Sequence, residues 1–160
     1  MFEKSAYSGN LLKDYDLLSK QLDALSTGEK DTVALLSNAS ALLNQFLDRV
    51  NWTGFYINQE DELVLGPFQG LPACIRIPFG KGVCGTAAAT EKTQRIADVH
   101  SFPGHIACDA ASRSEIVIPI NINGKLFGVL DIDSPETDRF TEEDERGLSQ
   151  FVKTLEKHLS

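Results

Sequence analysis

Apolar residues in the first fifty positions recur with the period of amphipathic helices. In residues 8–27 the steps between large apolar side chains alternate between four and three, which aligns them in one stripe along a helix. Residues 31–49 carry a second set of apolar positions at helical spacing. We therefore predict two helices, the first ending near Gly28. The first stripe suits either the core of the domain or pairing with a second copy of the chain in a homodimer.

After residue 50 the apolar pattern becomes that of β-strands. Two runs rich in aromatic and branched residues, 51–57 and 62–68, flank the polar turn 58–61. Apolar positions alternate again in residues 115–134, on both sides of Asn123-Gly124. That dipeptide is typical of two-residue hairpin turns. We therefore predict two antiparallel hairpins.

The C-terminal segment predicts a further helix and completes the fold class. Thr141 can cap a helix, acidic residues fill the turn that follows it, and an apolar face reaches Leu159. Helices at both ends of the chain can cover one face of an antiparallel sheet, which is an α+β arrangement. The sequence contains no internal repeat or linker, so we expect residues 1–160 to form a single domain.

The middle of the chain, residues 69–114, is irregular and rich in glycine and proline. It predicts one short helix over 82–90 and a short strand over 94–97. All three cysteines of the chain lie in this insert. Because a long loop-rich insert in a compact domain is usually functional, we expect it to cover the second face of the sheet and to carry the chemistry.

Composition and charge narrow the classes of function. The 160 residues include 15 basic and 23 acidic side chains, a net charge of −8. This charge excludes a general nucleic-acid binder and a polybasic membrane anchor. The sequence has no apolar run long enough to span a membrane and no secretory signal, so we expect a cytoplasmic protein.

The three cysteines allow buried thiols, a metal site or redox chemistry. Cys84 lies at a glycine-rich helix start beside Lys81, where a thiolate is favoured. Cys108 follows His100 and His105 in a loop, and these histidines could assist its deprotonation. Cys74, the third, completes the set. An odd number of cysteines argues against a permanent disulfide framework, and their spacing is poor for zinc, so we expect no metal.

Three acidic residues are candidates for a polar pocket. Asp131 and Asp133 are two apart on a strand and therefore share a face, and Glu115 begins the partner strand. They form either a solvated sheet end or a pocket for an ammonium group, in which crowding raises one carboxyl pKa. A plain two-residue turn at Asn123-Gly124 would point Glu115 to the other face. We therefore expect a bulge, an odd turn, or a Glu115 outside the ladder.

Two aromatic residues share a face of the first predicted strand. Trp52 and Tyr56 are four apart, and Gly54 leaves a gap between their rings. They are either ordinary core residues or an aromatic wall for a small ligand with an apolar or sulfur-bearing end.

Four motifs together give the chain a family resemblance: Asn51-Trp52-Thr53-Gly54-Phe55-Tyr56, Leu65-Gly66-Pro67-Phe68-Gln69-Gly70, Gly80-Lys81-Gly82-Val83-Cys84-Gly85 and Gly128-Val129-Leu130-Asp131-Ile132-Asp133-Ser134. With the three cysteines and the segment from Pro103 to Asp109, the chain resembles free methionine-(R)-sulfoxide reductases, which are stand-alone GAF domains. The resemblance implies reduction of free methionine-R-sulfoxide, with a thioredoxin as reductant and without a cofactor or metal.

The resemblance also implies roles for the candidate residues. Cys108 matches the nucleophile, and Cys84 and Cys74 match the other two redox cysteines. The acids and aromatics match the substrate site: Glu115, Asp131, Asp133, Trp52 and Tyr56. In oxidised protein we expect Cys108 bonded to Cys84 or Cys74, with Cys84 favoured by its helix start. The alternative is a GAF domain that senses a small molecule without catalysis.

Overall fold

The computed structural model of the protein describes residues 7–105 and 110–160. The regular elements, in chain order, are the helices and strands α1 (Leu11–Ser26), α2 (Thr32–Phe46), β1 (Trp52–Gln59), β2 (Glu62–Gly70), β3 (Arg76–Pro78), α3 (Gly82–Thr90), β4 (Gln94–Ile96), a 3₁₀ turn η1 (Val99–Ser101), β5 (Ser114–Ile122), β6 (Lys125–Ser134) and α4 (Glu142–Leu159). The predicted helices and hairpins are all present, with ends that differ by a few residues.

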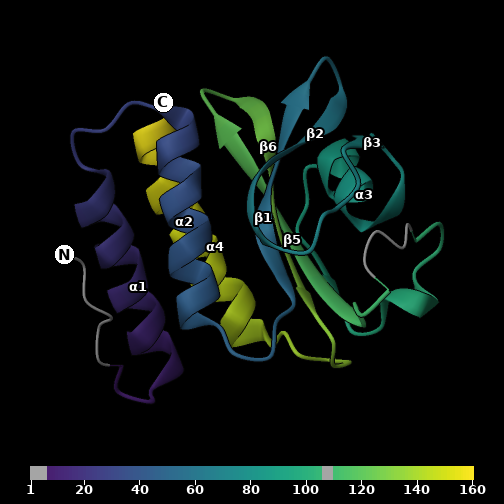
Figure 1. The fold of residues 1–160 in the computed structure, drawn as a ribbon, viewed down its shortest axis with the longest axis horizontal. Coiled ribbons are helices and arrows are strands. Elements are labelled where there is room, and N and C mark those ends of the chain that lie inside the picture. The colour runs from purple at the N-terminus through teal and green to yellow at the C-terminus, as the bar shows by residue number, and fades with distance from the viewer. Residues whose placement is uncertain (1–6, 106–109) are drawn as a thin grey trace.

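One six-stranded sheet forms the centre of the fold, in the order β3-β2-β1-β6-β5-β4. Every neighbouring pair of strands is antiparallel. In Figure 1, α1, α2 and α4 lie together on one side of the sheet, and α3 lies on the other. The predicted α+β arrangement, with the terminal helices on one face and the insert on the other, is thereby confirmed.

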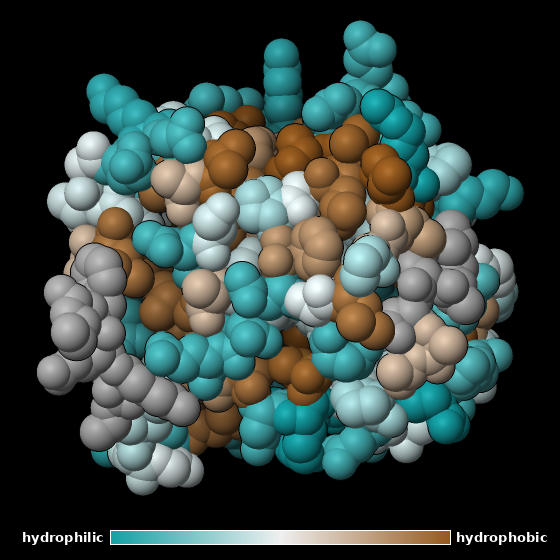
Figure 2. All heavy atoms as spheres, in the orientation of Figure 1, coloured by the Kyte–Doolittle hydropathy of each residue, from teal (hydrophilic) through white to brown (hydrophobic). Residues whose placement is uncertain are grey.

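Apolar side chains pack on both faces of this sheet, so the domain has two hydrophobic clusters. The larger one joins α1, α2 and α4 to the sheet and includes Tyr15, Leu18 and Leu22, which are fully buried. The stripe of α1 therefore serves the core of the domain. The smaller cluster lies between the sheet and α3 and contains Trp52 and Cys84. On the face drawn in Figure 2, polar residues are interspersed with the apolar ones.

A β-bulge sets the register of the β5–β6 hairpin. Next to the turn the strands pair as a two-residue turn requires, but the register shifts between Ile120 and Asn121. Phe127 is the extra residue on β6, because its neighbours pair in different registers on either side of it. Glu115 consequently lies opposite Asp133 and shares its face of the sheet. Of the three expected ways to bring the acids together, the bulge is the one that occurs.

A buried polar network fixes the start of α4. Thr141 and Asp144 form a capping box, as the sequence predicts. The Asp144 carboxylate also accepts a hydrogen bond of 2.7 Å from the Tyr15 hydroxyl. It forms an ion pair with the Arg139 guanidinium at 3.2 Å. The side chains of Arg139 and Asp144 are only 7% and 3% exposed. This network connects α1 to α4 beneath the sheet.

Two short elements in the insert were not predicted: β3 and η1. Each has three residues, too few to show a period in the sequence. β3 matters for the site, because its pairing with β2 anchors the segment that begins α3. Among the helices of the described residues, none is long and apolar enough to cross a membrane.

Candidate active site

Three neighbouring strands, β5, β6 and β1, form the floor of a pocket on the α3 side of the sheet. Glu115, Asp133 and Trp52 lie in one row across these strands. Asp131 and Gly54 lie side by side in the next row. All three acidic side chains are buried, at 5% to 8% exposed. The bulge in β6 is what aligns the acid from β5 with the two acids from β6.

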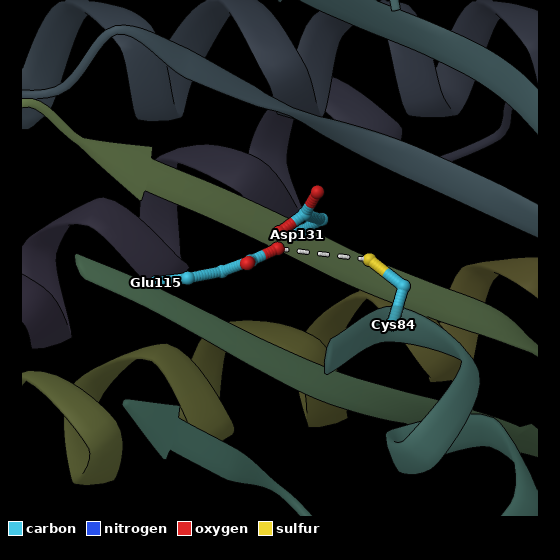
Figure 3. Close-up of side chains that lie close together, drawn as sticks. All are labelled: Cys84, Glu115 and Asp131. Carbon is cyan, nitrogen blue, oxygen red and sulfur yellow. Dashed lines mark hydrogen bonds between the residues drawn. The ribbon is translucent and has the colours of Figure 1, made fainter. Parts of the chain in front are cut away.

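The first turn of α3 forms one wall of the pocket and brings Cys84 over the acids. Gly82 has a φ of +64°, which an L side chain would oppose, and it starts the helix there. Gly85 packs closely on the preceding loop, where an added Cβ would lie 2.5 Å from the Pro78 carbonyl oxygen. Figure 3 shows Cys84 from α3, Glu115 from β5 and Asp131 from β6 pointing toward one another. The Cys84 thiol donates to Glu115 Oε2 at 3.8 Å.

Burial of these groups together favours their protonated forms. Loss of solvent, followed by the charges of Asp131 and Asp133, raises the pKa of Glu115 well above its ordinary value. Burial also raises the pKa of Asp131, although hydrogen bonds from Glu115 and Cys84 partly offset this effect. The pKa of Cys84 is raised for the same reasons, burial first and the neighbouring acids second. The expectation that the helix start and Lys81 would favour a Cys84 thiolate is therefore wrong.

Stacked aromatic rings form the opposite wall. The ring centroids of Trp52 and Tyr56 are 5.8 Å apart, and those of Trp52 and Phe68 are 5.1 Å apart. Gly54 faces Phe68 across β1 and β2. Hydrogen bonds from the wall also hold the segment before β3: the Trp52 indole donates to Leu71 O at 3.1 Å, and the Tyr56 hydroxyl donates to Cys74 O at 2.9 Å. Both predicted aromatics therefore line the pocket, and Phe68 supports the wall by stacking on Trp52.

The pocket opens to solvent, and the empty space in and over it amounts to about 500 Å³. Besides the predicted acids, aromatics and Cys84, its lining includes several residues from the insert, namely Ala73, Ile77, Lys81, Val83, His105 and Ser112. Burial and the nearby His100 lower the pKa of His105, so its imidazole is neutral at pH 7. The Nδ1 atom of His105 is buried and has no hydrogen-bond partner within residues 7–105 and 110–160. Ser112 and Ala73 carry no sequence signal that could have placed them here.

The three cysteines differ in their state and position. Cys84 is a free, buried thiol. Cys74 is disulfide-bonded. Cys108 lies outside the described residues. The expected preference for Cys84 in a disulfide is therefore wrong for this structure, because the Cys84 thiol faces Glu115.

Comparison with known proteins gives a consistent result. The model of the GAF domain matches residues 31–159 of the chain. The free methionine-R-sulfoxide reductase of Escherichia coli is 56% identical over 151 residues, which cover 94% of this chain and 92% of that protein. Two solved structures are similar over nearly their whole length. The fRMsr of Staphylococcus aureus in complex with substrate is 54% identical, with a TM-score of 0.88, and the match covers 98% of this chain and 100% of that one.

The second structure is the free methionine-R-sulfoxide reductase of Neisseria meningitidis in complex with its substrate. It is 42% identical, with a TM-score of 0.94 and coverage of 99% of this chain and 96% of that one. The fold and the matched residues define a GAF domain. Within that class, the chain belongs to the family of free methionine-R-sulfoxide reductases.

Proposed function

We propose that this protein reduces free methionine-R-sulfoxide to methionine in the pocket between the sheet and α3. The observation that carries this proposal is the meeting of three buried acids, an aromatic wall and the Cys84 thiol in one small site. The solved relatives from S. aureus and N. meningitidis, both in complex with substrate, support the same conclusion. The acids suit a free α-ammonium group, and the wall suits a methylsulfinyl end.

The pocket divides into two halves that match the two ends of the substrate. Asp131 and Asp133 supply negative charge at one end, where an ammonium group would compensate for their burial, and Glu115 lies beside them as an uncharged acid. Trp52 and Tyr56 offer ring faces at the other end. Because the pKa of Glu115 is raised by burial and by the two aspartates, Glu115 keeps a proton and is our candidate to protonate the sulfoxide oxygen.

The proposed reaction begins with attack of the Cys108 thiolate on the sulfoxide sulfur. Protonation of the oxygen accompanies the attack, methionine leaves, and the cysteine becomes a sulfenic acid. A second thiol condenses with the sulfenic acid, which forms a disulfide and releases water. An external dithiol of the thioredoxin type then reduces the disulfide by exchange. No organic cofactor or metal takes part in these steps.

We assign the resolving role to Cys74 and not to Cys84. Two features support this assignment: Cys74 is disulfide-bonded, and Cys84 is a free thiol whose pKa burial and the acids raise. A thiol that holds its proton is a poor nucleophile. Cys84 therefore lines the substrate pocket in this proposal, where it contacts Glu115.

A thiol titration separates the reductase from a sensing domain that only binds a ligand. Fully reduced protein is mixed with free methionine-R-sulfoxide without a reductant, and the remaining thiols are counted. A reductase loses two thiols per chain and releases one methionine. A sensor loses no thiols, and this result would contradict the proposed function.

Serine variants of the cysteines then assign the individual roles. Cys108→Ser should abolish methionine formation, because it removes the nucleophile. Cys74→Ser should release one methionine per chain and then stop, even with thioredoxin present. Without Cys74, the sulfenic acid on Cys108 cannot form the disulfide that thioredoxin reduces. Cys84→Ser should continue to turn over with thioredoxin. Full multiple-turnover activity in Cys108→Ser or Cys74→Ser would transfer the corresponding role to another residue.

A further inference from the structure

Cys84, Glu115 and Asp131 present three ligand atoms to a common point. One sulfur and two carboxylate oxygens, each from a different element, all lie within 4.8 Å of one another. The thiol sulfur and Glu115 Oε2 are 3.8 Å apart. In a tetrahedral zinc site with Zn–S of about 2.3 Å and Zn–O of about 2.0–2.2 Å, a sulfur and an oxygen ligand are about 3.5–3.7 Å apart. The Cys84–Glu115 pair is already close to this separation, and a shift of about 1 Å or less brings all three atoms to zinc geometry.

A second observation points to a cation at this place. Asp131 is 5% exposed, yet its Oδ1 atom has no hydrogen-bond partner within the described residues. A buried carboxylate oxygen without a partner costs free energy that a cation would recover. Asp131 lines the pocket itself. The buried site thus combines metal-donor atoms with a carboxylate oxygen that a cation would stabilise.

We propose that the pocket without its substrate binds one Zn²⁺ through Cys84 Sγ, Glu115 and Asp131, and that this ion inhibits the protein by competing with substrate. A sulfur donor with two carboxylates favours a borderline-soft ion over Mg²⁺ or Ca²⁺, which prefer sites made of oxygen alone. Three protein ligands leave the fourth position for a water, as in open zinc sites. The competition with substrate rests on the proposed function, whereas zinc binding itself does not.

Substrate and zinc exclude each other because they use the same oxygens. The ammonium group proposed for the substrate and the metal ion both require the Asp131 and Glu115 carboxylates. Cys84 contributes to zinc alone, because its sulfur is the ligand that distinguishes the metal from an ammonium group. Because Cys84 is a free thiol, its sulfur is available to bind a metal ion. This difference gives Cys84 the function of an inhibitory metal ligand.

The test measures binding of Zn²⁺ alone by calorimetry, on metal-free protein kept without reductant. We expect one Zn²⁺ per chain, no binding of Mg²⁺, and at least about tenfold weaker zinc binding in Cys84→Ser, since even outer-shell changes cost 10–100-fold. Glu115→Gln should weaken zinc binding as well. It tests the same site if Cys84→Ser does not fold. Glu62→Gln is the matched control and should keep wild-type affinity, because Glu62 is a partly exposed acid that is paired with Arg76. Equal zinc affinity in folded Cys84→Ser and wild type would overturn the proposal.

Two further readouts locate the ion. Co²⁺ in place of Zn²⁺ should give a thiolate-to-cobalt charge-transfer absorption that is absent in Cys84→Ser. Free methionine should weaken zinc binding more than glycine does, because glycine chelates zinc equally but lacks the side chain that fits the aromatic wall. An equal effect of both amino acids would overturn the shared pocket. Zinc binding that depends on Cys84 in a protein without reductase activity would contradict the proposed function and leave the metal site standing.

Discussion

Replacing Glu115 by Gln should stabilise the fold while it impairs the chemistry. Glu115 is 7% exposed and lies opposite Asp133 in the β5–β6 ladder. Burial, and then the two aspartates, raise its pKa well above the ordinary value. The folded protein therefore holds a proton that the unfolded chain releases above about pH 4.3. Gln keeps the shape of the side chain but has no proton to take up, so it removes the free-energy cost of protonating Glu115 on folding.

The size of the effect follows from proton linkage. For a group whose pKa rises on folding, stability is unaffected below the unfolded pKa and falls as pH rises toward the folded pKa. Each pH unit in this window costs about 1.4 kcal/mol. We expect Glu115→Gln to be more stable than wild type by roughly 1 kcal/mol or more at pH 7, and by much less at pH 4. In a domain of this length, 1 kcal/mol corresponds to about 2–4 °C in melting temperature.

The assay is urea unfolding of both proteins at pH 4, 5.5 and 7, together with steady-state reduction of methionine sulfoxide. Loss of the proton donor should lower kcat by at least about a hundredfold. Glu62→Gln is again the control, because an exposed ion pair contributes at most about 1 kcal/mol. A variant no more stable than wild type at pH 7, or a stability difference that does not change with pH, would refute the account of Glu115.

The remaining predictions concern packing and the buried network. Gly54→Ala should lose about 3 kcal/mol in urea unfolding, because the new Cβ would lie 2.2 Å from Phe68 Cβ in the neighbouring strand; unchanged stability would contradict this packing. Arg139→Ala should lose about 3–5 kcal/mol, because it leaves the buried Asp144 carboxylate without its cation. A loss below about 1 kcal/mol in the same measurement would show that the pair is not essential to the fold.

Periodicity predicted the elements of the fold well because each long element buries one regular face. The stripe of α1 and the alternation in the 115–134 hairpin both correspond to buried positions in the structure. The sequence also showed that Glu115 could join the two aspartates only through an irregularity. It did not show where, because the alternation of apolar positions alone does not locate an extra residue in a strand; the structure places it at Phe127. β3 was missed because three residues carry no period.

The site was predicted in its residues and less well in its electrostatics. The acids and aromatics were found because period-two spacing places them on shared faces. The predicted thiolate state of Cys84 was wrong. The effect of the helix start on its pKa is outweighed by burial among acids from β5 and β6. Ala73 and Ser112 reach the site from segments whose spacing relates them to no other site residue. Such contacts depend on the tertiary fold alone.

The most direct test of the central claim compares free methionine-R-sulfoxide with its N-acetyl derivative. The central claim is that Asp131, Asp133 and Glu115 bind a free ammonium group in a buried pocket. Acetylation removes that positive charge and adds bulk, so the carboxylates stay buried without their cation. At matched concentrations and with thioredoxin in excess, kcat/KM for the free amino acid should be at least about a hundredfold higher. Equal values of kcat/KM would contradict the ammonium pocket and would indicate an enzyme that acts on methionine sulfoxide within proteins.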